Sequence, residues 1–232
     1  MKILIVAATR FEIRPLAEKF AYVQKEDDSL AHYQFRNAKV DILITGIGMT
    51  PMAFYLGKQL PGSNYDVVIN AGICGSYSAS LPIGSVVNVT EESFCELGAE
   101  NNEEFLSLFE LGLMDPDESP YRAGKLLNNS TPHGDVLRKL KRVKGITAST
   151  IHGREETIRK IREVFKPEVE SMEGAAFFYA CLTSGVPFHQ LRGISNFVEE
   201  RDKSKWDIPL AVANLNSTVF EIIKEQKIEV TK

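Results

Sequence analysis

The amino-acid sequence predicts a single α/β domain over residues 1–232, built on a central mixed β-sheet that helices flank. Apolar runs with strand character alternate along the chain with segments whose apolar residues recur at helical spacing. The chain of 232 residues is 44% hydrophobic, which is enough to bury a substantial core. No linker, repeat or low-complexity segment interrupts this alternation, so all of the elements are expected to share one domain.

The N-terminal part of the chain is expected to begin with a buried strand, because residues 2–8 form a continuous run rich in Ile, Leu and Val. A helix over 46–60 is expected to have Thr50 as its N-cap and Pro51 at its first position. The elements expected up to residue 60 are a strand at 2–8, a helix at 11–20, strands at 31–36 and 40–46, and the helix at 46–60.

The rest of the chain continues the alternation. A buried strand at 65–76 is expected to run into a glycine-containing loop. Residues near 100–120 are acidic and rich in turn formers, which favours a peripheral insertion that forms a mobile loop or a short helix. The remaining expected elements are one or two strands at 83–97, a helix at 134–143, a strand at 145–151, helices at 154–165 and 173–185, a strand at 186–195 and a closing helix at 208–226.

Composition and charge restrict the partners, cofactors and cellular compartment that the sequence favours. The net charge of −4 predicts no footprint for nucleic acid or for an anionic membrane, so a small-molecule partner is expected. The four histidines and three cysteines show no metal-ligand spacing, and neither a metal nor another cofactor is expected. The odd cysteine count, the lack of a signal-peptide pattern and the lack of a long apolar run favour a cytoplasmic protein.

Ligands of α/β sheets bind beyond the carboxyl ends of the strands, so residues just past each expected strand are candidates for a site. Glu173 is a further candidate, because it lies at a helix start. The positions past the strands are Thr9, Arg10 and Glu12, residues 46–48, residues 71–76, residues 149–152, and Ser195 with Asn196.

Four motifs carry a resemblance to a known family: "GIG" before a helix, "VVINAGICGS", "VESMEGAA" and "RGISN". Their order and spacing resemble the nucleoside phosphorylase and nucleoside hydrolase superfamily, which includes the methylthioadenosine/S-adenosylhomocysteine nucleosidases. The resemblance covers nearly the whole chain. Within the superfamily, "SMEGAA" combined with "ISNFVEERDKSKWDIPLA" most resembles the futalosine hydrolases, which release hypoxanthine from futalosine in menaquinone biosynthesis. The resemblance to the superfamily also implies that the protein forms a homodimer or a higher homo-oligomer.

The resemblance implies roles for two glutamates. Glu12 matches the general base that activates water against the anomeric carbon. Glu173, with the preceding Met172, matches the pair that binds the ribose hydroxyls, where one carboxylate accepts from both hydroxyls. The alternative for Glu12 is a first-turn glutamate that only complements the helix dipole, and the alternative for Glu173 is a helix cap.

The resemblance also implies a purine pocket. Its expected members are Ala71, Gly72, Ile151, His152 and Asn196. Ile151 stands where the nucleosidases have an aromatic residue, so apolar contact replaces stacking. His152 is expected to contribute mainly its main-chain N–H and C=O, which read a purine edge.

Asn196 bears on the choice of base, because the adenine-specific nucleosidases have an aspartic acid at this position. A 6-oxopurine has acceptors at both N7 and O6, and an asparagine NH₂ donates to both and stabilises the departing base. Asparagine cannot act as a general acid, yet it can also bridge adenine through N6 and N7. Hypoxanthine is therefore the preferred leaving group, with adenine left open.

The nucleophile is expected to be water rather than phosphate. The first loop, "ATRFE", carries a carboxylate that repels a phosphate dianion, and Asn70 stands where phosphorylases have an arginine. Arg10 is the one residue that argues otherwise. The alternatives are a purine nucleoside phosphorylase, a methylthioadenosine or aminofutalosine nucleosidase, and a non-catalytic nucleoside-binding protein.

The 5′ side of futalosine carries an aryl carboxylate, which needs an apolar slot and a cation. The sequence offers Phe94, Phe105, Phe109 and residues 131–134 for the slot, although Phe105 and Phe109 also fit a core. The candidate cations are Arg10, His133, Arg154 and Arg201.

Overall fold

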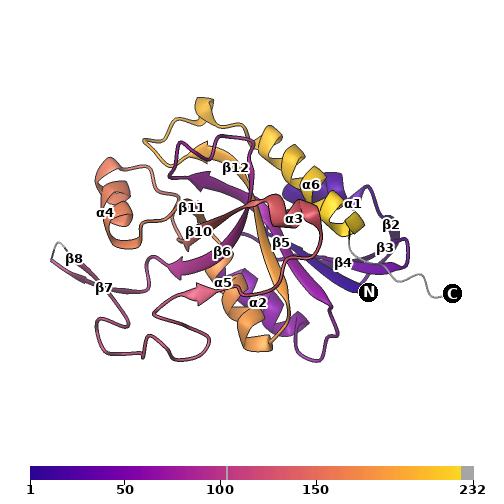
Figure 1. The fold of residues 1–232 in the computed structure, drawn as a ribbon, viewed down its shortest axis with the longest axis horizontal. Coiled ribbons are helices and arrows are strands. Elements are labelled where there is room, and N and C mark those ends of the chain that lie inside the picture. The colour runs from indigo at the N-terminus through magenta and orange to yellow at the C-terminus, as the bar shows by residue number, and fades with distance from the viewer. Residues whose placement is uncertain (103, 226–232) are drawn as a thin grey trace.

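A mixed sheet runs through the middle of the computed structural model, which describes residues 1–102 and 104–225 (Figure 1). Its 10 strands follow the order β11-β10-β6-β12-β5-β1-β4-β3-β2, with β9 paired to β6. The strands are β1 (Lys2–Ala7), β2 (Ala21–Lys25), β3 (Leu30–Phe35), β4 (Ala38–Ile44), β5 (Val67–Ser76), β6 (Val86–Phe94), β9 (Leu126–Leu127), β10 (Lys141–Thr147), β11 (Val169–Ser171) and β12 (Phe188–Phe197). The predicted α/β fold with a mixed sheet is confirmed.

Part of this sheet closes on itself. β11 pairs in parallel with β10 and in antiparallel with β5, so β5, β12, β6, β10 and β11 form a closed ring. β1 pairs in parallel with β4 and β5, and β5 pairs in parallel with β12. The carboxyl ends of these four strands therefore lie at one edge of the molecule.

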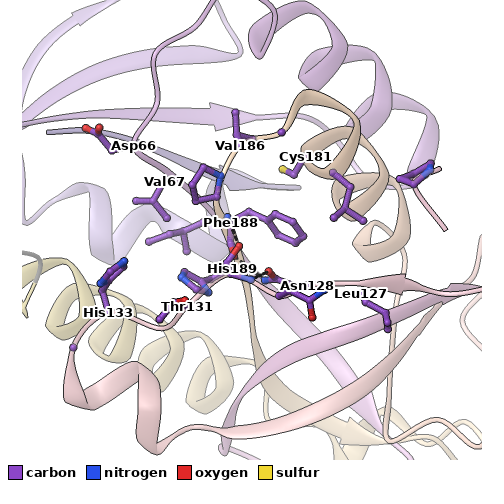
Figure 2. A pocket seen from close by; sticks show the side chains of 18 of the residues that line it. Asp66, Val67, Leu127, Asn128, Thr131, His133, Cys181, Val186, Phe188 and His189 are labelled. Carbon is purple, nitrogen blue, oxygen red and sulfur yellow. Dashed lines mark hydrogen bonds between the residues drawn. The ribbon is translucent and has the colours of Figure 1, made fainter. Parts of the chain in front are cut away.

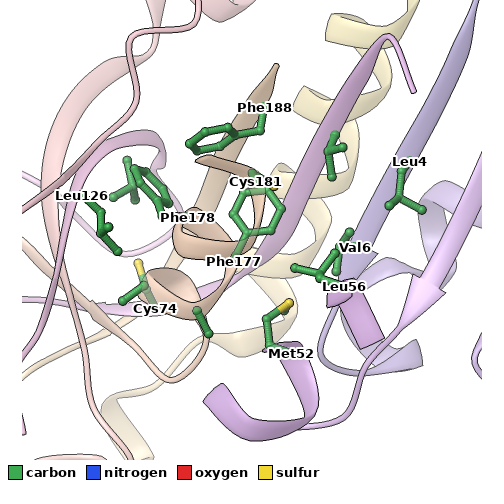
Figure 3. Packing of buried hydrophobic residues seen from close by; sticks show 14 of the residues in the cluster. Leu4, Val6, Met52, Leu56, Cys74, Leu126, Phe177, Phe178, Cys181 and Phe188 are labelled. Atoms are coloured by element: carbon green, nitrogen blue, oxygen red, sulfur yellow. The ribbon is translucent and has the colours of Figure 1, made fainter. Parts of the chain in front are cut away.

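Helices cover both faces of the sheet (Figure 1). α2 and α5 contribute Met52, Leu56, Phe177 and Phe178 to one apolar cluster, shown in Figure 3. α1, α3 and α6 contribute to a second cluster on the opposite face, and α4 packs on a smaller third one. The helices are α1 (Arg10–Ala17), α2 (Met49–Gln59), α3 (Asp135–Lys139), α4 (Glu155–Phe165), α5 (Gly174–Ser184) and α6 (Ile208–Glu225), with a 3₁₀ turn at Lys203–Lys205.

Several sequence-based expectations were wrong at their boundaries. α2 begins at Met49 with Gly48 as its N-cap, not Thr50, because Gly48 adopts φ 98°, a conformation that favours glycine. β5 continues through Ser76 instead of ending in a loop, since β11 and β12 both pair with its last residues. β2, β9 and β11 were not predicted. Residue 226 of the expected closing helix lies outside the described residues.

The predicted insertion near 100–120 differs in structure from the expected loop or helix. β7 (Gly98–Asn101) and β8 (Glu104–Ser107) form an antiparallel hairpin, which projects from the edge of the molecule in Figure 1. Phe105 packs on Phe165 of α4, with ring centroids 5.8 Å apart. The segment is therefore peripheral, as predicted, but it is anchored by paired strands.

β12 contains an irregularity that affects the site. Ile194 pairs with Cys74 and Asn196 pairs with Gly75, so Ser195 is an extra residue in β12. Such a bulge turns the following side chain relative to an undisturbed ladder. The Ser195 carbonyl accepts from Asp207 N at 2.9 Å, just before α6.

Within the described residues, every helix is too short or too polar to cross a membrane.

Candidate active site

The carboxyl ends of the parallel strands bring most of the predicted site residues together. Glu12 follows β1, Gly48 follows β4, and Gly72 and Asn196 lie in the last parts of β5 and β12. Glu173 joins them from the start of α5. This is the edge of an α/β sheet where ligands bind.

Glu12 is buried at the start of α1 and uses its two carboxylate oxygens differently. Oε2 accepts from the main-chain N and from Oγ1 of Thr9, both at 2.9 Å, in a capping box. Oε1 accepts from Ile73 N of β5 at 3.1 Å. Helix capping therefore accounts for one oxygen only, and the other faces the end of β5.

Glu173 lies opposite, directly after the half-buried Met172. Its Oε1 accepts from Gly48 N at 2.8 Å. Burial raises the pKa of the Glu173 carboxyl, and the charge of Glu12 adds to this, while the Arg192 guanidinium and the Gly48 N–H oppose it. The two carboxylates therefore influence each other electrostatically across one site.

Arg192 is a site residue that the sequence reasoning missed. It is 1% exposed, and its Nη2 donates to Asn70 Oδ1. A Cβ at Gly72 would lie 3.1 Å from Glu12 Oε1 and 3.3 Å from Arg192 Nη1, so this glycine leaves room for both groups. The sequence held one signal for this residue, a single charged side chain inside the strand expected at 186–195. Arginine is rarely fully buried without a partner, so its presence there indicates a polar site.

Asn196 is buried and its amide orientation is fixed by two neighbours. Nδ2 donates to the Phe197 carbonyl at 2.9 Å, and Oδ1 accepts from Ser195 Oγ at 2.8 Å. Because a carbonyl only accepts, the nitrogen must be the atom that faces Phe197. Ser195 Oγ also lies 3.2 Å from the Cys74 carbonyl, so its single hydrogen has two acceptors. The second N–H of the Asn196 amide and one lone pair of its oxygen are left to bind a ligand.

Ala71 and Gly72, predicted to line a purine pocket, differ in placement. Ala71 is fully buried and packs in the cluster beneath α1 and α6, so its side chain cannot line a site. Gly72 lies between Glu12 and Arg192, as described above. Only the main chain at Ala71 remains available for the predicted contact.

Ile151 and His152 lie on the loop between β10 and α4. Ile151 is 44% exposed, so an apolar side chain is available there. The main-chain N–H of His152, predicted to read a purine edge, instead donates to Glu170 Oε1 at 3.2 Å. Glu170 of β11 thus holds this donor, and the contact of the His152 main chain with a purine stays a prediction.

Glu170 holds the His152 side chain as well. His152 Nδ1 lies 2.6 Å from Glu170 Oε2, and the Tyr77 hydroxyl donates to the same oxygen at 2.6 Å. Burial alone would lower the pKa of His152, but the hydrogen bond and charge of Glu170, with the charge of Glu96, raise it. The His152 ring is therefore part of a buried network with Glu170 and Tyr77.

A further buried carboxylate, Glu92 of β6, lies beneath the start of α5. It is 1% exposed and accepts from Gln190 Nε2 at 2.5 Å and from Thr147 Oγ1 at 2.9 Å. Thr147 Oγ1 in turn accepts from Ala175 N at 2.7 Å. A Cβ at Gly174 would lie 2.1 Å from Glu92 Oε1, so only glycine fits after Glu173.

The titration of Glu92 predicts a pH-dependent stability. Burial raises the pKa of its carboxyl to about 7, whereas an unfolded glutamate titrates near its usual value. The folded state therefore retains a proton that the unfolded state loses, so this contribution is complete below the unfolded pKa and is lost as pH rises through about 7. We expect Glu92→Gln to remove roughly 3 kcal/mol of pH-dependent unfolding free energy between pH 4.5 and 8, measured by urea unfolding. The prediction would be contradicted if the unfolding free energies of wild type and variant changed in parallel with pH.

Cys95, Glu96 and His152 form a group whose potential ligand atoms all lie within 4.8 Å of one another. The sequence spacing gives no hint of this group, because the loop after β10 brings His152 to it. Zinc requires a deprotonated thiol, and burial raises the pKa of Cys95.

A depression of 1460 Å³ lies at the opposite end of the sheet, near the first residues of β5 and β12 (Figure 2). Val67, Phe188 and His189 line it. His133 and its neighbours in the 131–134 candidate slot line it too, whereas Glu12, Glu173 and the predicted purine pocket do not. Burial and the nearby His133 lower the pKa of His189 to about 4, so this imidazole is neutral at pH 7. The pocket is thus separate from the two glutamates.

The four candidate cations for an aryl carboxylate lie in different parts of the structure. Arg10 Nη2 donates to the Asp28 carbonyl at 2.6 Å, and Arg154 pairs with Glu156 at 3.6 Å. His133 lines the depression at the far end of the sheet and is not near the candidate site. Arg201 lies against the Ile151 loop, because a Cβ at Gly153 would lie 3.1 Å from its Cβ.

The apolar candidates for the same slot pack within the fold. Phe109 stacks edge-on against Tyr121 at 5.3 Å between ring centroids, and Phe94 packs against the cluster of α2 and α5. Phe105 contacts α4, as described above. These contacts match the alternative that Phe105 and Phe109 serve packing.

Curated relatives share most of this chain's length. The futalosine hydrolase of Streptomyces coelicolor is 32% identical over 192 residues, which cover 78% of this chain and 77% of that protein. The futalosine hydrolase of Thermus thermophilus is 28% identical and covers 96% of each chain. A methylthioadenosine/S-adenosylhomocysteine nucleosidase of Colwellia psychrerythraea is 26% identical over 244 aligned positions, which cover 94% of this chain and 93% of that protein.

Solved structures share the fold. The structure of futalosine hydrolase of Helicobacter pylori has a TM-score of 0.79 at 18% identity, covering 97% of this chain and 98% of that one. The Colwellia nucleosidase in complex with adenine has a TM-score of 0.78 at 23% identity, covering 97% of this chain and 95% of that one. The family model described as the phosphorylase superfamily matches residues 2–225. The resemblance predicted from the four motifs is thus confirmed, and the chain belongs to the phosphorylase superfamily, with futalosine hydrolases among its relatives.

Proposed function

We propose that this protein is an N-ribosyl hydrolase that cleaves futalosine into hypoxanthine and dehypoxanthine futalosine, a step of menaquinone biosynthesis. The observation that carries the proposal is that Glu12, Glu173 and a buried Arg192 lie close enough to influence one another at the carboxyl ends of the strands. Similarity to futalosine hydrolases over most of the chain supports the choice of substrate.

The proposed reaction uses the two carboxylates in different roles. Glu12 accepts a proton from water as the water oxygen bonds to the anomeric carbon and the glycosidic bond breaks. Glu173 binds the ribose hydroxyls, and Met172 contacts the sugar. The base leaves with the electron pair of the broken bond, and the free N–H of Asn196 stabilises that charge before solvent protonates the base.

Water fits this site better than phosphate. The cation nearest the predicted phosphate position is Arg192, whose Nη2 already donates to Asn70. Glu12 and Glu173 both face the same space, and two carboxylates repel a phosphate dianion. Arg10, the one residue that argued for phosphate, donates to the Asp28 carbonyl.

Two alternatives remain within the same fold. An adenine-releasing nucleosidase is favoured by the similarity to methylthioadenosine/S-adenosylhomocysteine nucleosidases. Asn196 argues against it, because an amide cannot protonate the departing base as an aspartic acid does. A non-catalytic nucleoside-binding protein has no use for Glu12 Oε1, which reaches beyond the helix that it caps.

Incubation with futalosine in phosphate-free buffer tests the reaction and the substrate together. We expect hypoxanthine to appear on chromatography at a rate that added phosphate does not change. Parallel assays with inosine, aminofutalosine and methylthioadenosine are expected to be slower. A phosphate-dependent release would establish a phosphorylase instead, and faster cleavage of an adenine nucleoside would exclude the proposed substrate.

We also propose that the protein acts as a homodimer or higher homo-oligomer in the cytoplasm. Ile47 and Phe54, both more than half exposed, give an apolar surface beside Gly48 and the site. Cys74, Cys95 and Cys181 are free thiols, as expected in a reducing compartment. Sedimentation velocity of the purified chain measures the number of subunits.

A further inference from the structure

Glu173 stands at the N-cap position of α5 without capping the helix. An N-cap side chain usually accepts a hydrogen bond from a main-chain N–H of the first turn, which has no partner within the helix. Within the described residues 104–225, Glu173 makes no such bond to α5, and its Oε1 accepts instead from Gly48 N at 2.8 Å. The carboxylate therefore binds the loop after β4 rather than its own helix.

Two hydroxyls cap α5 in its place. Ser171 Oγ accepts from Gly174 N at 3.3 Å, and Thr147 Oγ1 of β10 accepts from Ala175 N at 2.7 Å. Thr147 and Ala175 are both fully buried, so solvent does not reach the second of these bonds. A residue of a different strand thus takes the part that the N-cap side chain usually has.

Glu92 orients the Thr147 hydroxyl for this contact. A threonine hydroxyl has one hydrogen and two lone pairs. Thr147 Oγ1 donates its hydrogen to Glu92 Oε2 at 2.9 Å, so the lone pairs are the groups that Ala175 N meets. Gln190 Nε2 donates to the other oxygen of Glu92 and holds that carboxylate in place. The three side chains form one buried chain of hydrogen bonds that ends at the first turn of α5.

We propose that Thr147 is a positioning residue for Glu173: its hydroxyl, oriented by Glu92, caps α5 and so leaves the Glu173 carboxylate available to the ribose hydroxyls. This rests on the proposed nucleoside hydrolase function. A helix N-terminus carries a partial positive charge, and an unpartnered N–H there attracts a nearby carboxylate. Loss of the Thr147 hydroxyl is therefore expected to draw Glu173 from the sugar to its own helix.

Thr147→Val tests the proposal, because it removes the hydroxyl and nearly keeps the shape of the side chain. The assay compares futalosine with 2′-deoxyfutalosine, which lacks one of the two hydroxyls proposed to bind Glu173. We expect the ratio of kcat/KM for futalosine to that for the deoxy analogue to fall at least about tenfold from its wild-type value. A purely structural defect lowers both values by the same factor, and an unchanged ratio would overturn the proposal.

Three further variants complete the kinetic test. Thr147→Ser keeps the hydroxyl and is expected to hold the ratio within about threefold of wild type. Thr183→Val makes the same substitution at an exposed position of α5, and neither kcat/KM value is expected to change. Thr147→Cys, whose sulfur is only a weak acceptor, replaces Thr147→Val if the valine variant does not fold. If Thr147→Ser loses as much of the ratio as Thr147→Val or Thr147→Cys, the hydroxyl has no such role.

Crystal structures of the wild type and of Thr147→Val test the positioning without turnover. We expect the Glu173 carboxylate to leave Gly48 N and to accept from Ala175 N in the variant. A carboxylate that keeps its bond to Gly48 N would refute the role of Thr147. If the wild-type protein cleaves no nucleoside, the proposed function fails, while this comparison still decides whether the Thr147 hydroxyl holds Glu173 away from its helix.

Discussion

Glu12→Gln is expected to lower kcat for futalosine by about 10³-fold, with KM changed by less than about threefold. Glutamine cannot take the proton of the attacking water, so the chemical step loses its base. The substitution is a mild one for the fold, because glutamine also serves in a capping box with Thr9. Steady-state kinetics, with the thermal unfolding midpoint as a check on folding, measures the effect.

Glu18→Gln is the matched control for this experiment. Glu18 caps the other end of α1, and its side chain is exposed and pairs with Arg14 at 3.5 Å. An exposed pair of this kind contributes little, so kcat is expected to stay at the wild-type value. If Glu12→Gln retains turnover within tenfold of wild type, Glu12 only caps its helix and the reaction scheme is wrong.

Arg192→Met is expected to lower kcat/KM by about 10²- to 10³-fold and to shift the acidic limb of the pH–rate profile upward. The guanidinium opposes the burial that raises the pKa of Glu173, so its loss raises that pKa further. Removing one partner from a buried set of charges also destabilises the fold, by roughly 3–5 kcal/mol. Rates measured between pH 5 and 9, together with urea unfolding, separate the two effects.

Two further variants serve as controls for Arg192→Met. Arg192→Lys keeps the positive charge, so its pH profile is expected to stay close to that of wild type while the geometry to Asn70 is lost. Arg159→Met removes an exposed arginine of α4 that pairs with Glu163, and neither the rate nor the profile is expected to change. An acidic limb that stays in place in Arg192→Met would mean that the guanidinium does not tune the site.

The fold was predictable where the pattern is long and local. Residues 2–8 and the long run that became α6 carry enough apolar residues to define a strand and a helix by periodicity. β11 has only three residues, and it exists because β10 and β5 pair with it from distant parts of the sequence. The closed ring depends on that pairing, which no local sequence pattern predicts.

The candidate site was predictable in part. Glu12, Glu173 and Asn196 follow strands or begin a helix, and family motifs mark them. Arg192 was missed because it lies within an apolar strand, where its partners come from other elements. The network of Glu170 with His152 and Tyr77 was missed because it depends on the pairing of β11 in the closed ring.

The bulge at Ser195 has an implication for how the Asn196 amide is oriented. The extra residue supplies the hydroxyl that engages the Asn196 oxygen, and its carbonyl ties the strand to the start of α6. Deleting Ser195 would keep the side chains proposed to meet the purine, yet it would leave the Phe197 carbonyl as the one neighbour described here that orients the amide. The orientation of the amide proposed to meet the base is thus set by the length of one strand as well as by the identity of its residues.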